Sequence, residues 1–351
     1  MLPLAIIAMS KIPSVSAAKH RRIPWLLVAA GLIVAAWPIT PAQAGEERSA
    51  AYMKYYRGHL LRMTRDAYRK GQVLPASQII PQRQAAIQLR ASSKAYATAT
   101  WIGHASFLVR LGNTTILTDP VYSSHPSPLA PAGPRRMAPP GLRFGDLPRI
   151  HAIVLSHAHY DHTGFPTLRR LAARDKRTVV LAPPKFRPLL SQAGFTRIIV
   201  LQPDGKAKVG NVRFTAVKVP HISGRDIDGD DYPHAFGWRM EAPRYRLFFA
   251  GDTSYGPQFR RSRRRQGRVN AALVPIGAYA PRRFEKVNHV NPEEALRIAR
   301  DMGASLAIAM HWGTFALTPE PIMEPKQRFL AARGGPRRVV PKIGETIILK
   351  R

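Results

Sequence analysis

The stretch LSHAHYDHTG (residues 155–164) decides how this chain is expected to fold. Within six consecutive positions it holds three histidines and an aspartate: His157, His159, Asp161 and His162. An apolar run at 151–156 precedes these residues and is typical of a buried strand, whereas the apolar spacing at 165–174 is typical of a helix. The four side chains are therefore expected on a loop at the carboxyl end of a strand, where α/β folds place their chemistry.

The spacing within this stretch predicts a metal site. Alternate side chains of an extended segment point the same way, so His157 and His159 can reach one cation. Asp161 and His162 lie beyond the turn and can reach a second cation. The chain contains no cysteine, which excludes disulfides, iron–sulfur clusters and thiolate metal sites. Any metal ligands must therefore offer nitrogen or oxygen.

Three later polar residues extend this ligand set. His221 follows the run FTAVKVP, Asp252 follows YRLFFAG and His311 follows SLAIAM. A single residue of this kind at the end of an apolar run would be interpreted as a turn cap. Three of them, together with the histidine cluster, supply enough ligands for two cations. Two neighbouring cations can lower the pKa of a bridging water and hold both oxygens of an in-line displacement.

The organisation of the chain indicates one α/β domain with an N-terminal extension. Apolar residues make up 45% of the sequence, enough for a substantial core. Strand and helix patterns alternate from residue 98 to the end, which predicts a single α/β domain at 98–351. The segment 45–97 has helical spacing and many arginines. Strands are expected at 106–119 (a hairpin), 151–156, 178–182, 197–201, 212–219, 245–252, 271–277 and 306–313, and helices at 165–174, 185–194 and 291–303.

Residues 1–44 have the features of a signal peptide. A basic KHRR precedes the apolar run at 23–39, and AQA at 42–44 is a small-x-small cleavage site. This pattern predicts export to the periplasm or cell envelope. An uncleaved segment would instead anchor the chain in the inner membrane.

The motifs together resemble the metallo-β-lactamase superfamily. The phrases WIGHASFLVRLGNTTILTDPVYS, GPRR, LSHAHYDH, HISGR, RLFFAGDTSYG, VPIGAYAPR, NHVNPEEAL and MHWGTFALTPEP are similar to the branch containing the N-acyl-phosphatidylethanolamine-hydrolysing phospholipase D and its bacterial relatives. They span residues 101–325. The resemblance implies an αββα four-layer sandwich with a dinuclear metal site along one edge.

The same resemblance implies roles for individual residues. His157, His159 and His221 would hold the first metal, and Asp161, His162 and His311 the second. Asp252 would bridge the two ions. A set of nitrogen and oxygen ligands favours zinc over iron or manganese. The implied reaction is attack of a metal-bridging hydroxide on a phosphodiester, as in a phospholipase D acting on N-acyl-phosphatidylethanolamine-like lipids.

Residues around the ligands are further candidates. Asp161 is a possible proton acceptor as well as a ligand. His289 is expected to act as an acid or substrate contact, or else to pack at a helix start. Tyr160 and Tyr255 flank ligands and would either bind substrate or pack. We expect His104 to be a structural histidine on a separate hairpin, and Asp119 to orient the site from outside the ligand set.

The charge of the chain indicates anionic partners. The formal net charge is +33, and FRRSRRRQGR at 259–268 places arginines, Arg261 and Arg264 among them, directly after the Asp252 loop. We expect these two arginines at the mouth of the site, in contact with a phospholipid or small phosphodiester and an anionic membrane surface. A solvated helix face is the alternative. Nucleic acid is disfavoured because the run lacks interleaved aromatic residues.

Two other functions remain open from the sequence. A metal-dependent lactonase or carboxylic-ester hydrolase would use the same ligand set on a different bond. A non-catalytic metal-binding envelope protein is disfavoured because the ligand set is complete.

Overall fold

The computed structural model describes residues 50–128, 130–225, 232 and 234–351. The expected signal peptide at 1–44 lies outside the described residues. Within them, no helix has the length and apolar character needed to cross a membrane.

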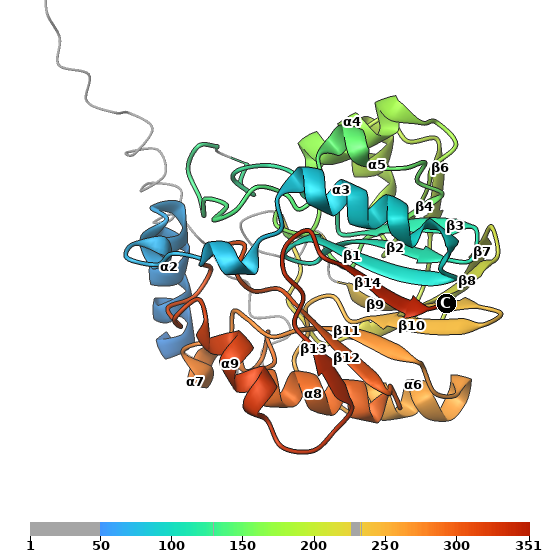
Figure 1. Ribbon diagram of the computed structural model, residues 1–351. Helices are drawn as coiled ribbons and strands as arrows, with labels where there is room; N and C mark the ends of the chain where they lie inside the picture. The colour runs from blue at the N-terminus through green and yellow to red at the C-terminus, as the bar shows by residue number, and fades with distance from the viewer. Residues whose placement is uncertain (1–49, 129, 226–231, 233) are drawn as a thin grey trace, which may run out of the picture. The chain divides into compact units, whose positions relative to one another are not determined.

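Two seven-stranded sheets form the frame of the protein (Figure 1). The first has the order β14-β1-β2-β3-β4-β5-β6 and the second β13-β12-β11-β10-β9-β8-β7. The first sheet comprises β1 (Ala97–Gly103), β2 (Ser106–Leu111), β3 (Thr114–Thr118), β4 (Ala152–Val154), β5 (Val179–Ala182), β6 (Arg197–Val200) and β14 (Thr346–Lys350). The second comprises β7 (Lys206–Val209), β8 (Val212–Val219), β9 (Ala235–Ala242), β10 (Tyr245–Phe249), β11 (Ala271–Pro275), β12 (Leu306–Met310) and β13 (Arg337–Val339).

Both sheets follow the same plan. In each, the strands at one side pair antiparallel, and three successive parallel pairs follow: β3–β4–β5–β6 in the first and β10–β11–β12–β13 in the second. Parallel strands need crossover connections, which here are helical in several cases. The carboxyl ends of β4, β10 and β12 lead directly into the predicted ligand residues.

Helices cover the outer face of each sheet, which completes four layers (Figure 1). In that view α3, α4 and α5 lie above the first sheet, and α6, α8 and α9 lie below the second. The α-helices are α2 (Ala50–Thr64), α3 (Gln82–Ala91), α4 (Phe165–Arg174), α5 (Arg187–Gln192), α6 (Gln258–Gln266), α7 (Arg282–Glu285), α8 (Pro292–Asp301) and α9 (Glu324–Ala331). Short 3-10 turns lie at Ala67–Arg69, Ala76–Gln78, Ser92–Lys94 and Phe144–Asp146. The αββα sandwich expected from the sequence is confirmed.

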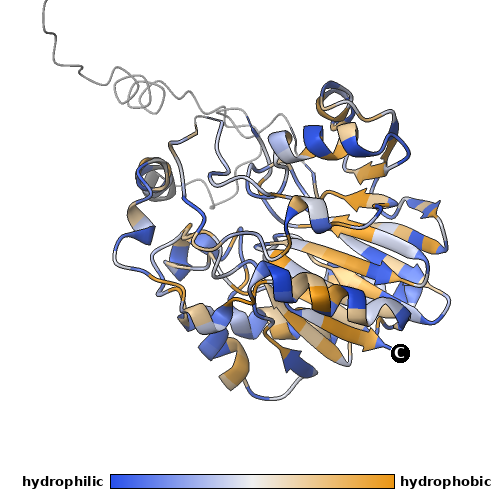
Figure 2. Ribbon diagram, turned by 45° about the horizontal axis from the view of Figure 1, so that its top comes forward, coloured by the Kyte–Doolittle hydropathy of each residue, from blue (hydrophilic) through white to orange (hydrophobic). Residues whose placement is uncertain are grey.

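The core has two apolar parts. The larger lies between the sheets and under α8, with Trp238, Phe248 and Ile308 fully buried. The smaller lies between the first sheet and helices α4 and α5, where Leu168 packs with Ile153. Apolar residues alternate with polar ones along the outer strands and run continuously along the central strands (Figure 2). Strands buried on both faces are expected between two layers, and each buried leucine or phenylalanine contributes roughly 1.5–3 kcal/mol.

The sequence patterns locate most of the central elements and miss several strands. The helix predicted at 165–174 is α4, and the helix at 291–303 contains α8 with the expected capping box between Asn291 and Glu294. Strands β1, β7, β9, β13 and β14 were not predicted. The residues of β7, β13 and β14 are largely exposed or half-buried, so they lack the apolar runs that mark a central strand. Strands β1 and β9 are buried, but threonines interrupt the apolar residues of β1, and a glycine and charged residues interrupt those of β9.

Candidate metal centre

The loop after β4 is shaped by its own backbone. The amides of His162 and Thr163 donate to the carbonyl of His159, and the Thr163 hydroxyl donates to the carbonyl of His157 at 2.7 Å. These bonds close a tight turn, and Gly164 then precedes α4. Because of this turn, the side chains that precede it and those that follow it approach the same buried centre from two sides.

The predicted ligands of the first metal converge. His157 Nε2 lies 3.0 Å from His159 Nδ1, which lies 3.3 Å from His221 Nε2. Nitrogens bound to one tetrahedral zinc at about 2.0–2.1 Å would be separated by roughly 3.3 Å. The three rings are therefore spaced as ligands of a single ion would be. His157 is fully buried, whereas His159 and His221 are partly exposed.

The predicted ligands of the second metal converge beside them. Asp161 Oδ2 lies 3.5 Å from His162 Nε2 and 3.7 Å from His311 Nε2. Both rings are fully buried. The positive φ of His311, 59°, turns its side chain back toward this point immediately after β12.

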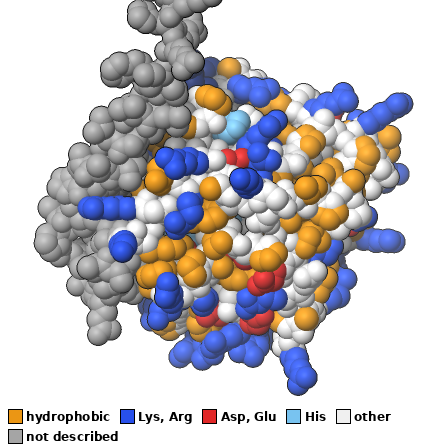
Figure 3. Space-filling model, turned by 90° about the vertical axis from the view of Figure 1, so that its left-hand side faces the viewer, with side chains coloured by type: hydrophobic (Ala, Val, Ile, Leu, Met, Phe, Trp, Pro, Cys, Tyr) orange, Lys and Arg blue, Asp and Glu red, His pale blue; other side chains and the backbone are white. Residues whose placement is uncertain are grey.

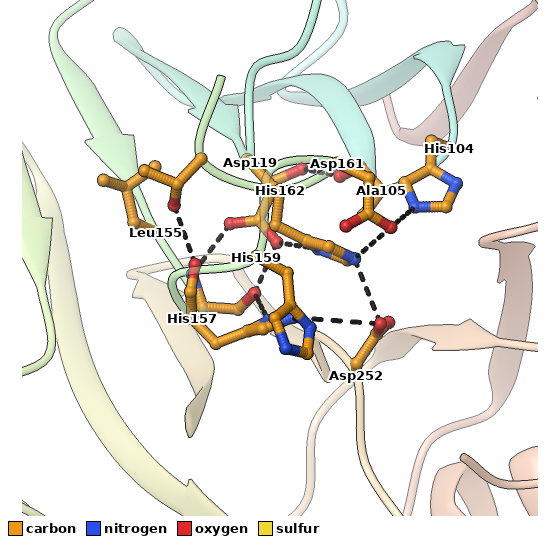
Figure 4. A network of polar contacts seen from close by, with 12 residues as sticks. His104, Ala105, Asp119, Leu155, His157, His159, Asp161, His162 and Asp252 are labelled. Carbon is orange, nitrogen blue, oxygen red and sulfur yellow. Dashed lines mark hydrogen bonds and ion pairs between the residues drawn. The ribbon is translucent and has the colours of Figure 1, made fainter. Parts of the chain in front are cut away.

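Asp252 lies between the two groups (Figure 4). Its Oδ2 is 3.0 Å from His162 Nε2, 2.9 Å from His311 Nε2 and 4.0 Å from His157 Nε2. One carboxylate oxygen thus faces ligands of both groups, as a bridging residue would. Asp252 is 2% exposed, because β10 delivers it from the middle of the second sheet.

Residues behind the ligands fix the orientation of the rings. Asp119 Oδ2 accepts from His162 Nδ1 at 2.7 Å and also from the Ser156 hydroxyl. The Ser156 oxygen in turn accepts from His157 Nδ1 at 2.9 Å. With Nδ1 carrying the proton, Nε2 of each ring keeps its lone pair toward the centre. This arrangement agrees with the orienting role expected of Asp119.

His221 is oriented in the same way by backbone. Its Nδ1 donates to the carbonyl of Asn288 at 2.9 Å. No sequence pattern singles out Asn288, because a contact through a backbone carbonyl does not depend on the type of side chain. Sequence reasoning likewise missed Ser156, which lies inside an apolar strand pattern.

His104 corrects an expectation. The sequence placed it on a separate hairpin, away from the metal site. The β1–β2 turn instead projects it into the centre, with Nε2 2.7 Å from Asp161 Oδ2 and its ring 3.9 Å from that of His311. The hairpin predicted at 106–119 corresponds to β2 and β3, and its distance from the site could not be read from spacing along the chain.

Burial and charge give the two groups opposite protonation. Burial lowers the pKa of His159 to about 3 and the pKa of His157 well below its usual range. Burial also lowers the pKa of His311 in isolation, but the Asp252 and Asp161 carboxylates outweigh it and raise that pKa to about 9. The same carboxylates raise the pKa of His162. Without bound ions, burial favours the neutral form of the rings in the first group, whereas the carboxylates favour the protonated form of His162 and His311.

The buried polar atoms of the centre fit bound cations. Among the described residues, His162 Nε2, His311 Nε2 and Asp252 Oδ1 are buried without a hydrogen-bond partner. Unpaired buried polar atoms cost free energy unless a ligand or ion satisfies them. The donor set, imidazole nitrogen with carboxylate oxygen, suits zinc and other borderline divalent ions.

His289 and the two tyrosines lie at the edge of the centre. His289 Nδ1 is 3.8 Å from Asp252 Oδ2 and its ring is 5.1 Å from that of His221, whereas Asn291 caps α8. Tyr160 packs under the Arg225 guanidinium at 4.3 Å. The Tyr255 hydroxyl donates to Asp301, which directs it away from the ligands.

Arg261 and Arg264 are not brought to the site mouth. Both are exposed on α6, which packs against α8 and β8. Their neighbour Arg260 pairs with Asp301 at the far end of α8, and β11 returns from the end of α6 toward His311. The run directly follows the Asp252 loop in sequence, but α6 carries it along the sheet to the opposite end.

Two cavities open beside the centre. One of about 500 Å³ is lined by His221, Ile222, Tyr255, Arg282 and Lys286, among others. The other, of about 630 Å³, lies between residues 122–128 with Ala130, Tyr160 and the start of α4. On the face that Figure 3 shows, lysine and arginine side chains are interspersed with apolar ones, and little histidine reaches the surface.

Comparison with known proteins shows the family to which this chain belongs. The model of the beta-lactamase superfamily domain matches residues 114–312, more than half of the chain. A solved structure described as a possible metal-dependent hydrolase from Veillonella parvula superposes with a TM-score of 0.58, at 19% identity, over 72% of this chain and 100% of that one. The chain belongs to the metallo-β-lactamase superfamily and is a metal-dependent hydrolase of that superfamily.

Individual proteins are also similar in sequence to this chain. The chain is 30% identical to the N-acyl-phosphatidylethanolamine-hydrolyzing phospholipase D 1 of Caenorhabditis elegans over 241 residues, 66% of this chain and 68% of that protein. It is 35% identical over 238 residues to an uncharacterized protein of Mycobacterium tuberculosis, covering 66% of this chain. The chain spans 63% of the length of that mycobacterial relative.

Proposed function

We propose that this protein is a dinuclear phosphodiesterase of the phospholipase D type, acting on N-acyl-phosphatidylethanolamine-like lipids. The observation that carries the proposal is the position of Asp252 Oδ2, within 3.0 Å of two histidines of one ligand group and 4.0 Å of a histidine of the other. That geometry is suited to a pair of ions rather than to one. The similarity to the nematode phospholipase supports the choice of substrate.

Each ligand group would hold one ion. His157, His159 and His221 would hold one ion, and Asp161, His162 and His311 the other, with Asp252 between them. When bound, two divalent ions supply Lewis-acid polarisation of phosphoryl oxygens and activation of water. Asp119, Ser156 and the Asn288 carbonyl hold the ligand rings so that little reorganisation is needed.

His289 is proposed to protonate the leaving alkoxide. It lies beside Asp252 and His221, and its Nδ1 has no hydrogen-bond partner among the described residues. Replacement by Gln should slow a diester with an alkyl alcohol as leaving group far more than one with nitrophenol, because a nitrophenolate leaves without a proton. Equal losses for both diesters would contradict this role. Asp161 is the proposed proton acceptor.

The first experiment compares two substrates on metal-analysed protein. The protein is expected to cleave a soluble chromogenic phosphodiester, and Asp252→Asn is expected to abolish that activity. Asp204→Asn is the matched control, because Asp204 is an exposed partner of Arg265. Cleavage of a lactone and not of the diester would overturn the proposal in favour of the lactonase alternative. Diester cleavage would be followed by assays on N-acylated phospholipids.

The proposed setting is the cell envelope, against an anionic membrane surface. The net charge of +33 and the exposed arginines of α6 support it, since clustered cations attract acidic headgroups. Mass spectrometry of the N-terminus from a membrane fraction is the test of export. A mature protein that begins at Met1 in the soluble fraction would refute the signal peptide.

A further inference from the structure

His104 has a backbone that is locked in place. It occupies the turn between β1 and β2 with a φ of 54°, in the left-handed region that side chains rarely adopt. Its amide donates to Thr314 Oγ1 at 2.6 Å, and its carbonyl accepts from Trp101 Nε1 at 2.9 Å and from the His311 amide at 3.1 Å. Three hydrogen bonds hold an unfavourable conformation, so the position of the side chain is imposed by the surrounding structure.

The side chain of His104 is directed at one atom. It is 1% exposed, and Nε2 lies 2.7 Å from Asp161 Oδ2 (Figure 4). An ionised carboxylate only accepts hydrogen bonds, so Nε2 carries the proton and donates it. The other ring nitrogen, Nδ1, lies on the far side of the ring and has no partner among the described residues.

This hydrogen bond separates two possible roles. His104 Nε2, Asp161, His162 and His311 lie close enough together to share one ion. A nitrogen that donates its proton to Asp161, however, has no lone pair left for an ion. The geometry thus assigns His104 to the support of a ligand rather than to the ligand set.

We propose that His104 is a positioning residue that fixes the Asp161 carboxylate for the second ion. It does for a carboxylate what Asp119 does for His162, with donor and acceptor exchanged. The oxygen it holds, Oδ2, is the one that faces His162 and His311. Loss of such a support costs about 10–100-fold in metal affinity.

A matched pair of variants tests this role. Methionine and glutamine have nearly the same size, and glutamine alone can donate a hydrogen bond from the position of Nε2. Both meet the same left-handed backbone, so the strain cancels in the comparison. Calorimetric titration of zinc into chelator-treated protein is expected to show two steps in the wild type. In His104→Met the second step should weaken about 10–100-fold and the first should stay unchanged, and in His104→Gln most of the second step should be recovered.

Several results would overturn the inference. Equal second-step affinities in His104→Met and His104→Gln would show that the hydrogen bond is unimportant. Loss of both steps in both variants would show a purely structural role, which thermal unfolding of the chelator-treated proteins would report independently. Visible spectra of the Co²⁺-loaded protein decide the ligand alternative: shifted bands in His104→Gln would make His104 a ligand. A wild type that binds one ion would also overturn it, and none of these results depends on the substrate cleaved.

Discussion

The two ligand groups of the centre differ in charge and in support. The first consists of three histidines, two of them partly exposed, and its member His221 lines a cavity of about 500 Å³. The second contains two fully buried histidines and the partly exposed Asp161 carboxylate, and it is held from behind by Asp119 and His104. Burial keeps the rings of the first group neutral, whereas carboxylates raise the pKa of His162 and His311 in the second.

This difference predicts two kinds of metal binding. A neutral group of nitrogens accepts an ion without losing protons. A group of imidazolium rings paired with carboxylates must release protons when an ion binds. The first site is therefore expected to exchange its ion readily through the cavity, and the second to bind in a strongly pH-dependent way.

Replacing Asp252, the residue that faces both ligand groups, should weaken metal binding at both sites. Asp252→Asn removes a carboxylate that faces both groups and takes away the carboxylate oxygen nearest to Nε2 of His162 and of His311. We expect loss of most bound metal and a fall of roughly 10³-fold or more in kcat/KM. Metal analysis together with steady-state kinetics checks this. Wild-type stoichiometry in Asp252→Asn would refute the assignment of the bridging residue.

Replacing a ligand of one group should affect that group first. His159→Ala is expected to lose the first ion and nearly all hydrolysis while one ion remains bound to the second group. The measurement is zinc content after exhaustive dialysis, with His151→Ala as the control, since His151 lies at the other end of β4. An unchanged content of about two ions would contradict the ligand assignment.

Replacing Asp119, which orients a ligand, should weaken the binding of one ion and also destabilise the fold. Asp119→Ala leaves the buried Ser156 amide and His162 Nδ1 without their acceptor. The expected costs are about 10–100-fold in affinity for the second ion and about 1–3 kcal/mol in the free energy of unfolding. Urea unfolding of chelator-treated protein measures the second. Unchanged unfolding would mean that water replaces the lost acceptor.

The pH dependence of stability should have opposite signs for the two groups. The pKa of His311 is about 9 in the folded chain and near 6.5 when unfolded, so its stabilising contribution is present below pH 6.5 and is lost as the pH rises through about 9. The pKa of His159 is about 3 when folded, so its contribution is lost as the pH falls below about 6.5. Urea midpoints of chelator-treated protein should therefore decline on both sides of neutrality, and His311→Gln should reduce the alkaline decline and leave the acidic decline unchanged.

The smallest effect is expected for the surface arginines. Arg261→Ser with Arg264→Ser should weaken binding to anionic vesicles by a few-fold and leave cleavage of a soluble diester unchanged. Arg260→Ser with Arg265→Ser is the matched control: it removes the same charge from α6, but these two arginines are ion-paired with Asp301 and Asp204. Equal vesicle affinity of both double variants and the wild type would refute membrane docking through α6.

The resemblance of the motifs implied the sandwich, whereas local patterns in the sequence indicated the ligand residues. Apolar runs mark β4 of the first sheet and β10 and β12 of the second, and the polar residues after these strands meet at the centre. Sequence reasoning did not reach His104, whose contact with Asp161 depends on a left-handed turn and on how two sheets stack. It also misplaced Arg264, because the direction of α6 is set by packing on α8 rather than by spacing.

The contacts of the N-terminal extension determine where the chain can be truncated. The Tyr55 hydroxyl of α2 donates to Glu285 of α7 at 2.6 Å, and the Tyr55 ring stacks on Phe284 at 4.2 Å. Helix α7 leads within three residues to Asn288, whose carbonyl orients His221. A recombinant fragment starting at residue 98 would leave Glu285 buried without this partner. The extension therefore belongs to the catalytic unit, and a fusion or truncation should be placed before α2.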